Sequence, residues 1–261
     1  MNPVVELILN RKSVRAYEDE EISEETRREI LAATLRAPTA GNMMLYSIVQ
    51  VNDQEKKNTL AKTCDNQPFI ARAPWVLLFL ADYQRWFDYF IASRVKETCA
   101  QNKVAMRMPE EGDLFLACCD ALIAAQTAVI AAESLGIGSC YIGDIMENYE
   151  AHRELFNLPP YVFPICLVCF GYPTQQQKER ERTSRFQSKF IVFENKYNRL
   201  DKESLEEMFR DAQESVFRDR KEVEGTLNLG QLLYQRKFNA DFSIEMTRSV
   251  RVILERWKGG D

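Results

Sequence analysis

Near the start of the chain, four residues are of the types that bind phosphate groups: Arg11, Lys12, Ser13 and Arg15. If this segment is extended, Arg11, Ser13 and Arg15 point to one side of it, because successive side chains of a strand alternate. Two guanidinium groups and a hydroxyl on one side suit a phosphate, whose oxygens match the planar guanidinium fork. The alternative is an ordinary solvated face of charged residues.

A histidine-based active site is not expected. The sequence holds one histidine, His152, in the polar context Ala-His-Arg-Glu, and we expect it to face solvent on a helix. A single histidine excludes His-rich metal sites, and it leaves any Ser-His-Asp or Cys-His triad dependent on this one residue. We therefore expect the chemistry to come from a bound cofactor.

Composition narrows the class of protein. Of the 261 residues, 46% are hydrophobic and 28% are charged, as is usual for soluble globular proteins. The formal net charge of −5 argues against nucleic acid as the main partner. The seven cysteines show no zinc-type spacing and predict buried free thiols in a reducing compartment. The apolar part of the N-terminus is too short for a signal peptide, so we expect a cytoplasmic protein.

Residues 114–135, LFLACCDALIAAQTAVIAAESL, predict one long helix that is small or apolar on nearly every face. Such a helix either spans a membrane or forms the buried centre of a soluble fold. Asp120, Gln126 and Glu133 interrupt the run, which leaves no stretch of about 20 apolar residues to cross a bilayer. We therefore expect a buried central helix that ends at Leu135-Gly136 and leads into a short strand.

Periodicity and turn residues predict the other elements. Helices are expected over 3–9, 23–36, 56–63 and 147–155, and strands over 47–52, 75–81, 140–142, 163–171 and 190–195. Residues 37–42, APTAGN, predict a loop of small residues whose backbone can approach a flat ligand. Residues 83–113 predict helical excursions near the surface. Amphipathic helices follow residue 200, so we expect a core over 1–199 and a helical extension over 200–261 that packs on the core or on a second subunit.

The order of these segments resembles the nitroreductase superfamily of flavin-dependent oxidoreductases. The resemblance rests on RKSVRAYEDEEIS, APTAGN, AAESLGIG, YIGD, and GYP followed by a basic loop. The helical region after FIVFENKY is similar to that of the larger, NADPH-preferring nitroreductases and flavin reductases. The resemblance covers essentially the whole chain. It implies an α+β fold of three layers, α/β/α, with a central mixed sheet, a buried central helix and a helical C-terminal extension.

The resemblance also implies a homodimer with two FMN sites at its interface, each built by both subunits. The N-terminal segment matches the family's FMN segment through Arg11, Lys12, Ser13 and Arg15. The loop beside the flavin, usually from the partner subunit, matches Thr39, Ala40, Gly41 and Asn42, where several relatives have a serine run. The residue near the pyrimidine edge matches Gln67. The strand end, where Gly143 leaves room behind the ring and a backbone amide reaches N5, matches Tyr141, Ile142, Gly143 and Asp144.

A late basic pair on the phosphate matches Arg182 and Arg185. Counting from Gly171 favours Arg182, counting back from Phe193 favours Arg185, and Arg180 stays open. An arginine for the NADPH phosphate is expected in the extension, at Arg218 or Arg220.

The activity implied by the resemblance needs no side-chain nucleophile. NAD(P)H reduces FMN and leaves, and an oxidised small-molecule acceptor (a nitroaromatic, a quinone or free flavin) is then reduced by two electrons in a ping-pong cycle. The alternatives are a specialised flavin reductase or dehalogenase-like member of the fold, and a flavin-binding dimer without turnover.

Overall fold

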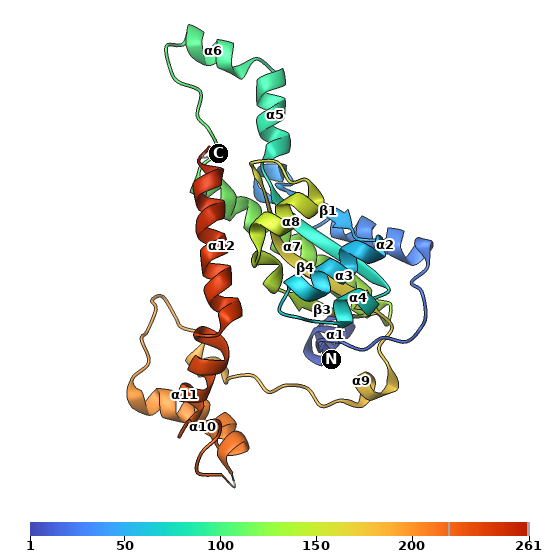
Figure 1. The fold of residues 1–261 in the computed structure, drawn as a ribbon, viewed down its shortest axis with the longest axis vertical. Helices are drawn as coiled ribbons and strands as arrows, with labels where there is room; N and C mark the ends of the chain where they lie inside the picture. The colour runs from blue at the N-terminus through green and yellow to red at the C-terminus, as the bar shows by residue number, and fades with distance from the viewer. Residues whose placement is uncertain (219, 260–261) are drawn as a thin grey trace. The chain divides into compact units, whose positions relative to one another are not determined.

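In the computed structural model, residues 1–218 and 220–259 are described, and the chain divides into two compact units (Figure 1). The first unit is Met1–Glu181 together with the segment from Glu245 onward, and the second is Arg182–Ile244. The units are divided at different residues from the division expected between 199 and 200. The reason is that the last helix returns to the first unit, where Ile253 and Trp257 are buried in a cluster with Leu114.

A four-stranded sheet forms the centre of the first unit, in the order β1-β2-β4-β3. The strands are β1 (Tyr46–Gln50), β2 (Trp75–Asp82), β3 (Gly138–Ile142) and β4 (Val162–Gly171). All three pairings between them are antiparallel. The mixed sheet expected from the resemblance is therefore present only through one parallel bridge, between Ser13 and Ser139. The continuous apolar run of β2 is explained by its central position, because every residue of β2 is buried.

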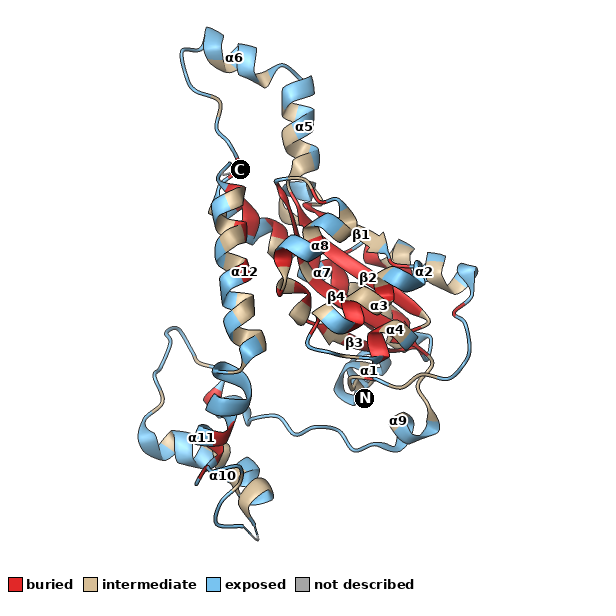
Figure 2. Cartoon of the chain, in the orientation of Figure 1, coloured by how far each residue is buried: buried red, intermediate tan, exposed pale blue. Residues whose placement is uncertain are grey.

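Helices cover both faces of the sheet and confirm the three-layer α+β fold. On one face, the second and seventh helices pack against alternate residues of β2 and β4 such as Trp75, Leu77 and Val168. On the other face, the third and fourth helices pack against Val76, Leu78 and their neighbours. Alternation of side chains along a strand separates the two clusters. Figure 2 shows the buried sheet between partly exposed helices.

The expected helices of the first unit are present, and their bounds follow from their caps. Asn2, Ser23 and Asp53 cap the first three by accepting bonds from backbone N–H groups of the first turn. The helices are α1 (Pro3–Asn10), α2 (Glu24–Thr34), α3 (Gln54–Thr63), α4 (Phe69–Arg72), α5 (Gln84–Ala92), α6 (Val95–Gln101), α7 (Glu111–Ser134), α8 (Tyr149–Phe156) and α9 (Gln175–Glu179), with short 3₁₀ turns η1 (Ala40–Asn42) and η2 (Asp144–Met146).

The predicted central helix is α7, which begins at a capping box formed by Glu110 and Asp113. Its length and composition alone would allow it to cross a membrane. In the fold, its small residues, including Ala121, Ala124 and Ala128, are fully buried against β2 and α2. The opposite face is exposed in the single chain. The expected central helix is therefore buried on one face within the single chain.

The second unit is helical, as expected for the end of the chain. It holds η3 (Ser188–Phe190), α10 (Lys202–Phe217), α11 (Leu229–Leu233), the π-helical turn η4 (Tyr234–Phe238) and the start of α12 (Asp241–Trp257). The strand predicted over 190–195 is wrong: the segment is a 3₁₀ turn followed by irregular chain. Phe190 is buried there, but Ile191 and Val192 are exposed. β-propensity makes a strand only where a neighbouring strand offers a ladder and a surface to cover.

Candidate functional site

The cationic segment 11–15 runs beside β3, where Ser13 forms a parallel bridge with Ser139. Its Val14 N–H donates to the carbonyl of Ser139 in β3 at 2.8 Å. Val14 is buried, and it lies so close to Gly138 that a Cβ on that glycine would fall 2.5 Å from Val14 Cγ2. The glycine therefore lets the segment pack directly against β3. This contact fixes the predicted phosphate-binding residues along the edge of the sheet.

The N-terminal cations meet a second basic segment. Lys12 Nζ donates to the carbonyl oxygens of Lys178, at 2.6 Å, and Arg180, at 2.5 Å. The Arg180 guanidinium in turn donates to the carbonyl oxygen of Ser13. Arg180, the candidate that sequence counting left open, is thus the late arginine placed beside this segment within the first unit.

Arg182 and Arg185 belong to the second unit and are described only within it. The Arg185 guanidinium donates to the carbonyl oxygens of Thr183, at 3.3 Å, and Ser184, at 3.2 Å. Their predicted contact with a phosphate stays a prediction.

Arg11 and Arg15 present cationic groups at this edge. Within the described residues, Arg11 Nη1 is buried and has no hydrogen-bond partner. Arg15, whose guanidinium lies 6.0 Å from the ring centre of Phe69, lines a cavity of about 220 Å³ with Tyr17 and Arg72. A buried guanidinium nitrogen without an acceptor loses its hydration without compensation. The edge therefore has positive charge and an unused donor for an anionic group.

The small-residue loop is built around one buried carboxylate. Asp120 of α7 accepts bonds from the Thr39 hydroxyl, from Ala40 N at 3.0 Å and from Leu45 N at 3.1 Å. Three residues of the loop (Gly41, Asn42 and Met44) have φ between 50° and 57°, a region that costs energy for residues with a side chain. The sequence showed Asp120 only as an interruption of the apolar helix. The structure shows that it determines the shape of the loop.

The end of β3 brings together the other predicted residues. Gln67 Nε2 donates to Asp144 Oδ2 at 2.7 Å and to the carbonyl oxygen of Cys64 at 3.0 Å. Ile142 is buried, and the Tyr141 hydroxyl donates to Gln126 Oε1 at 3.2 Å. A Cβ built on Gly143 would meet no atom of the described chain within 4 Å. The Gln67–Asp144 pair therefore borders an open space at Gly143.

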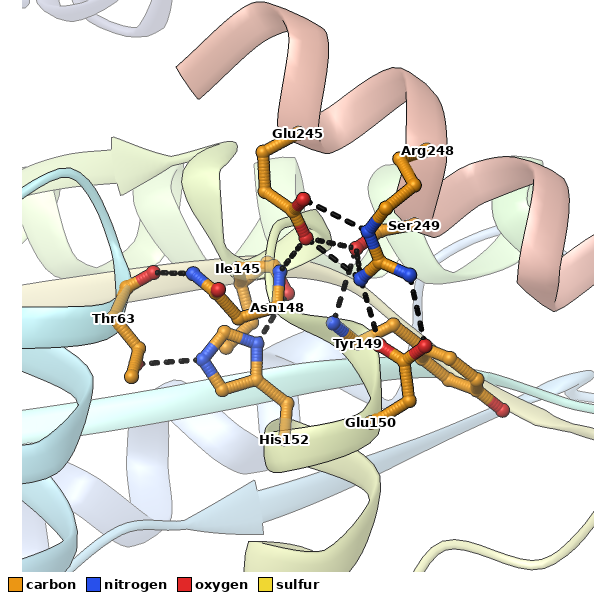
Figure 3. A network of polar contacts seen from close by, with 9 residues as sticks. All are labelled: Thr63, Ile145, Asn148, Tyr149, Glu150, His152, Glu245, Arg248 and Ser249. Carbon is orange, nitrogen blue, oxygen red and sulfur yellow. Dashed lines mark hydrogen bonds and ion pairs between the residues drawn. The ribbon is translucent and has the colours of Figure 1, made fainter. Parts of the chain in front are cut away.

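The start of α8, which follows Gly143 and η2 in the chain, is bound by side chains of α12 (Figure 3). Glu245 accepts from the N–H of Asn148 at 3.1 Å, and Ser249 Oγ accepts from the N–H of Tyr149 at 3.1 Å. These N–H groups begin α8, whose own cap residue makes no side-chain bond to them. The last helix of the chain therefore caps α8 from outside.

His152 is placed differently from the solvent-facing position predicted for it. It is fully buried, with Nδ1 2.8 Å from the carbonyl oxygen of Ile145 and Nε2 2.7 Å from the Thr63 hydroxyl. Burial lowers the pKa of His152, so the neutral ring serves as a structural link between α3, η2 and α8. The polar sequence context was misleading because neighbours along the chain do not report which face of a short helix is covered.

Two carboxyl groups near the predicted site, those of the half-buried Glu133 and the buried Glu147, were given no role from the sequence. Burial raises the pKa of Glu133 to about 7, against the opposing effect of Arg11. Burial, followed by the effect of Asp144, raises the pKa of Glu147 to about 8. Shifted titratable groups gather at functional sites, and each of these lies beside a predicted site residue.

Within one chain, the predicted residues form two groups. The cationic segment and the Gln67–Asp144 pair both lie at β3, whereas the loop 39–42 precedes β1, at the opposite edge of the sheet. Within one chain, the loop 39–42 is therefore not brought to the other predicted residues.

Comparison with known proteins identifies the family. The nitroreductase family model matches residues 8–172. The chain belongs to the nitroreductase family. It is 34% identical over 182 residues to the FMN reductase [NAD(P)H] of Bacillus subtilis, with 70% of each protein covered. It is 29% identical over 205 residues to the oxygen-insensitive NADPH nitroreductase of Salmonella typhimurium, covering 78% of this chain and 79% of that protein. The solved NADPH:FMN oxidoreductase of Vibrio harveyi, complexed with NAD⁺, superposes with a TM-score of 0.76 at 25% identity, covering 97% and 98% of the two chains.

The residues of this nitroreductase-family chain suit the groups of FMN. A phosphate would satisfy the buried Arg11 Nη1 and the neighbouring cations. Both hydrogen bonds of the Gln67 amide, to Asp144 and to the Cys64 carbonyl oxygen, are donated by Nε2, so Oε1 can accept from a ring N–H. Because a Cβ built on Gly143 meets no atom of the described chain within 4 Å, a flat group would be able to approach the backbone closely there.

Proposed function

We propose that this chain is an FMN-dependent NAD(P)H oxidoreductase that reduces nitroaromatic, quinone or flavin acceptors by two electrons. The observation that carries the proposal is the placement, in a nitroreductase-family chain, of a cationic segment beside β3 and of the Gln67–Asp144 pair just after the end of that strand. When bound, FMN would take a hydride from NAD(P)H and pass two electrons to the acceptor. The protein's own part is binding, orientation and electrostatics.

Three groups of residues would carry out this binding and orientation of FMN. Arg11, Arg15 and Arg180 neutralise the phosphate, with Lys12 holding the basic segment in place through its carbonyl oxygens. Gln67, oriented by Asp144, binds the pyrimidine edge of the ring. The backbone at Gly143 would lie behind the reactive part of the ring, where the lack of a side chain leaves room for the ring to approach.

We also propose that the active form is a homodimer. The exposed face of α7 carries Phe115, Leu116, Cys119, Leu122 and Ile123, and α1, which contacts α7, exposes Val4, Val5, Ile8 and Leu9. Contiguous apolar surface of this kind marks an interaction site. Pairing of α7 across an interface would cover it, and would allow Thr39, Ala40, Gly41 and Asn42 of one subunit to reach the FMN of the other.

NADPH as the preferred donor, Arg218 or Arg220 as the residue on its extra phosphate, and a cytoplasmic location complete the proposal. Arg218 follows the last turn of α10, and Arg220 N–H donates to the carbonyl oxygen of Phe217 at 3.2 Å. Steady-state rates with NADPH and NADH, each for wild type, Arg218→Ala and Arg220→Ala, test this part. Loss of NADPH preference in either variant supports it, and equal preference in all three proteins contradicts it.

The activity is tested by the spectrum of the purified protein. We expect flavin absorbance that anaerobic NADPH bleaches and that nitroaromatic, quinone or flavin acceptors restore. Protein that is colourless and cannot be reconstituted with FMN would contradict the proposal. Protein that binds FMN but is not bleached by either nucleotide would indicate the non-catalytic alternative.

The dimer is tested by the variant Phe115→Glu/Leu122→Glu, with Val192→Glu as a matched control on an exposed apolar residue of the second unit. We expect wild type and control to sediment as dimers and the α7 variant as a monomer that retains FMN poorly. A monomeric wild type with full FMN content would contradict the proposal.

A further inference from the structure

Glu147, three residues after Asp144, lies next to the Gln67–Asp144 pair. The turn η2 closes with a bond from Glu147 N–H to the Asp144 carbonyl oxygen at 3.0 Å. Glu147 is the first residue after this turn, and its carboxyl group interacts with that of Asp144. Glu147 is 4% exposed. Within the described residues, its Oε1 is buried without a hydrogen-bond partner.

The surroundings of Glu147 favour its neutral form. The charged side chains that act on it are all acidic: Asp144 in η2, Asp65 in the loop after α3, and Glu245 in α12. The nearby cation Arg248 pairs with Glu245 at 2.8 Å, so its positive charge is already matched by that carboxylate. The neighbouring His152 is neutral and buried. Burial and this acidic surrounding disfavour ionisation of Glu147, so its carboxyl group retains its proton.

The contacts of Gln67 place this proton on Glu147. Asp144 Oδ2 accepts from Gln67 Nε2 at 2.7 Å, so that oxygen of Asp144 acts as an acceptor. The second hydrogen of Nε2 is directed to the Cys64 carbonyl oxygen. The amide is thereby fixed with Oε1 as the group left to meet a ligand. An ionised Glu147 would repel Asp144 and release this orientation.

The segment has little freedom to relieve such repulsion. The His152 ring is bonded to Ile145, and Asn148 is held by Thr63 at 2.8 Å and by Glu245 at 3.1 Å (Figure 3). Both sides of Glu147 are thus anchored, and separation of the two carboxyl groups requires breaking these bonds.

We propose that Glu147 is a positioning residue for the FMN site: by holding a proton against Asp144, it keeps the Gln67 amide oriented to accept from the ring. This inference rests on the proposed function. Its consequence is an FMN affinity that depends on pH. Protein with Glu147 ionised is not competent to bind, so the apparent Kd rises as the competent fraction falls. With the pKa of Glu147 at about 8, the Kd at pH 9 is expected to be about tenfold above that at pH 7.

The test is FMN titration of the apoprotein, followed by flavin fluorescence, between pH 6.5 and 9. Glu147→Gln keeps the size of the side chain and replaces the O–H donor of the protonated carboxyl group with an amide N–H that cannot ionise, so we expect wild-type affinity at pH 7 and no rise in Kd at pH 9. Glu154→Gln, on the exposed face of α8, is the matched control. Its Kd for FMN should rise between pH 7 and pH 9 as in wild type.

The possible outcomes separate the inference about Glu147 from the proposed function. A tenfold rise in wild type and control that is lost in Glu147→Gln supports the inference. Tight FMN binding with the same pH profile in all three proteins overturns it and leaves the proposed function intact. Failure of wild type to bind FMN at any pH overturns both. If Glu147→Gln binds FMN weakly at every pH, the role assigned to its proton is wrong.

Discussion

The carboxylate of Asp120, in the middle of α7, accepts a hydrogen bond from the hydroxyl of Thr39, in the loop before β1. The same carboxylate binds the N–H groups of Ala40 and Leu45. The central helix therefore does more than fill the core, because its one buried charge in this region shapes a loop predicted to lie beside the flavin.

Replacing Asp120 tests this relationship. Asp120→Ala leaves the Thr39 hydroxyl and two backbone N–H groups without their acceptor, and we expect unfolding free energy to fall by about 2–4 kcal/mol. Asp120→Asn keeps one carbonyl oxygen as an acceptor and should lose less unfolding free energy than Asp120→Ala. Urea unfolding of the three proteins measures both changes. An Asp120→Ala variant within about 0.5 kcal/mol of wild type would show that the loop finds its shape without this residue.

Glu245 should make the protein sensitive to acid. Its hydrogen bond with Arg248 lowers the pKa of Glu245 from 4.5 to about 2 in the folded chain. A lowered pKa means that the ionised group stabilises the folded state above pH 4.5, and that this contribution is lost as the pH falls toward 2. Glu245→Gln should therefore melt below wild type at pH 7, and the difference in Tm should narrow by pH 3.

The matched control for this prediction is Glu255→Gln, on the exposed side of the same helix. It should melt close to wild type at both pH values. A Tm difference between Glu245→Gln and wild type that is the same at pH 7 and pH 3 would mean that the charge of Glu245 does not contribute.

Arg15 is expected to contribute directly to FMN retention. A charge-assisted hydrogen bond is worth roughly 1.5–3 kcal/mol, so Arg15→Ala should raise the Kd for FMN by roughly 10- to 150-fold. Arg28→Ala, an exposed arginine on α2, is the control for a general change in charge. Fluorescence titration at two salt concentrations measures the effect. Unchanged occupancy in Arg15→Ala would remove Arg15 from the phosphate site.

Three further variants decide which late arginine serves the phosphate. Arg180 bonds to the backbone of Ser13, so Arg180→Ala should weaken FMN binding through both lost charge and a displaced N-terminal segment. Arg182→Ala and Arg185→Ala should weaken it less if Arg180 is the phosphate residue. The same titration ranks the three, and a larger effect at Arg182 or Arg185 would favour the assignment made from sequence spacing.

Residues with local signals could be predicted well. Ser23 caps α2 as its type and position indicate, and the uninterrupted apolar run of β2 lies at the centre of the sheet. The strand predicted over 190–195 failed because apolar β-branched residues do not specify a partner strand. The solvent-facing position predicted for His152 was wrong, and Glu147 was not singled out, for a related reason: the groups around them come from α3, the loop after it and α12, which are distant in sequence.

The site shows the same distinction. The cationic segment 11–15 and the small-residue loop follow from residue types that act locally. The roles of Asp120 and Arg180 depend on contacts across 81 and 167 positions of the chain, and residue spacing carries no information about them. Counting along a loop could place a basic residue near the phosphate only to within a few positions, because extra residues in an irregular loop shift the register.

A substitution at Gly143 should separate the effect on folding from the effect on FMN binding. Its φ is −78° and a Cβ there meets no atom of the described chain within 4 Å, so Gly143→Val should fold with a Tm close to wild type. In the FMN complex, the added side chain would occupy the space against the ring, and we expect the Kd for FMN to rise at least tenfold. Gly143→Ala should fall between the two. Thermal melting of the apoprotein, alongside FMN titration, measures both properties on the same samples. If Gly143→Val binds FMN like wild type, the open space at the end of β3 is not the place where the ring lies.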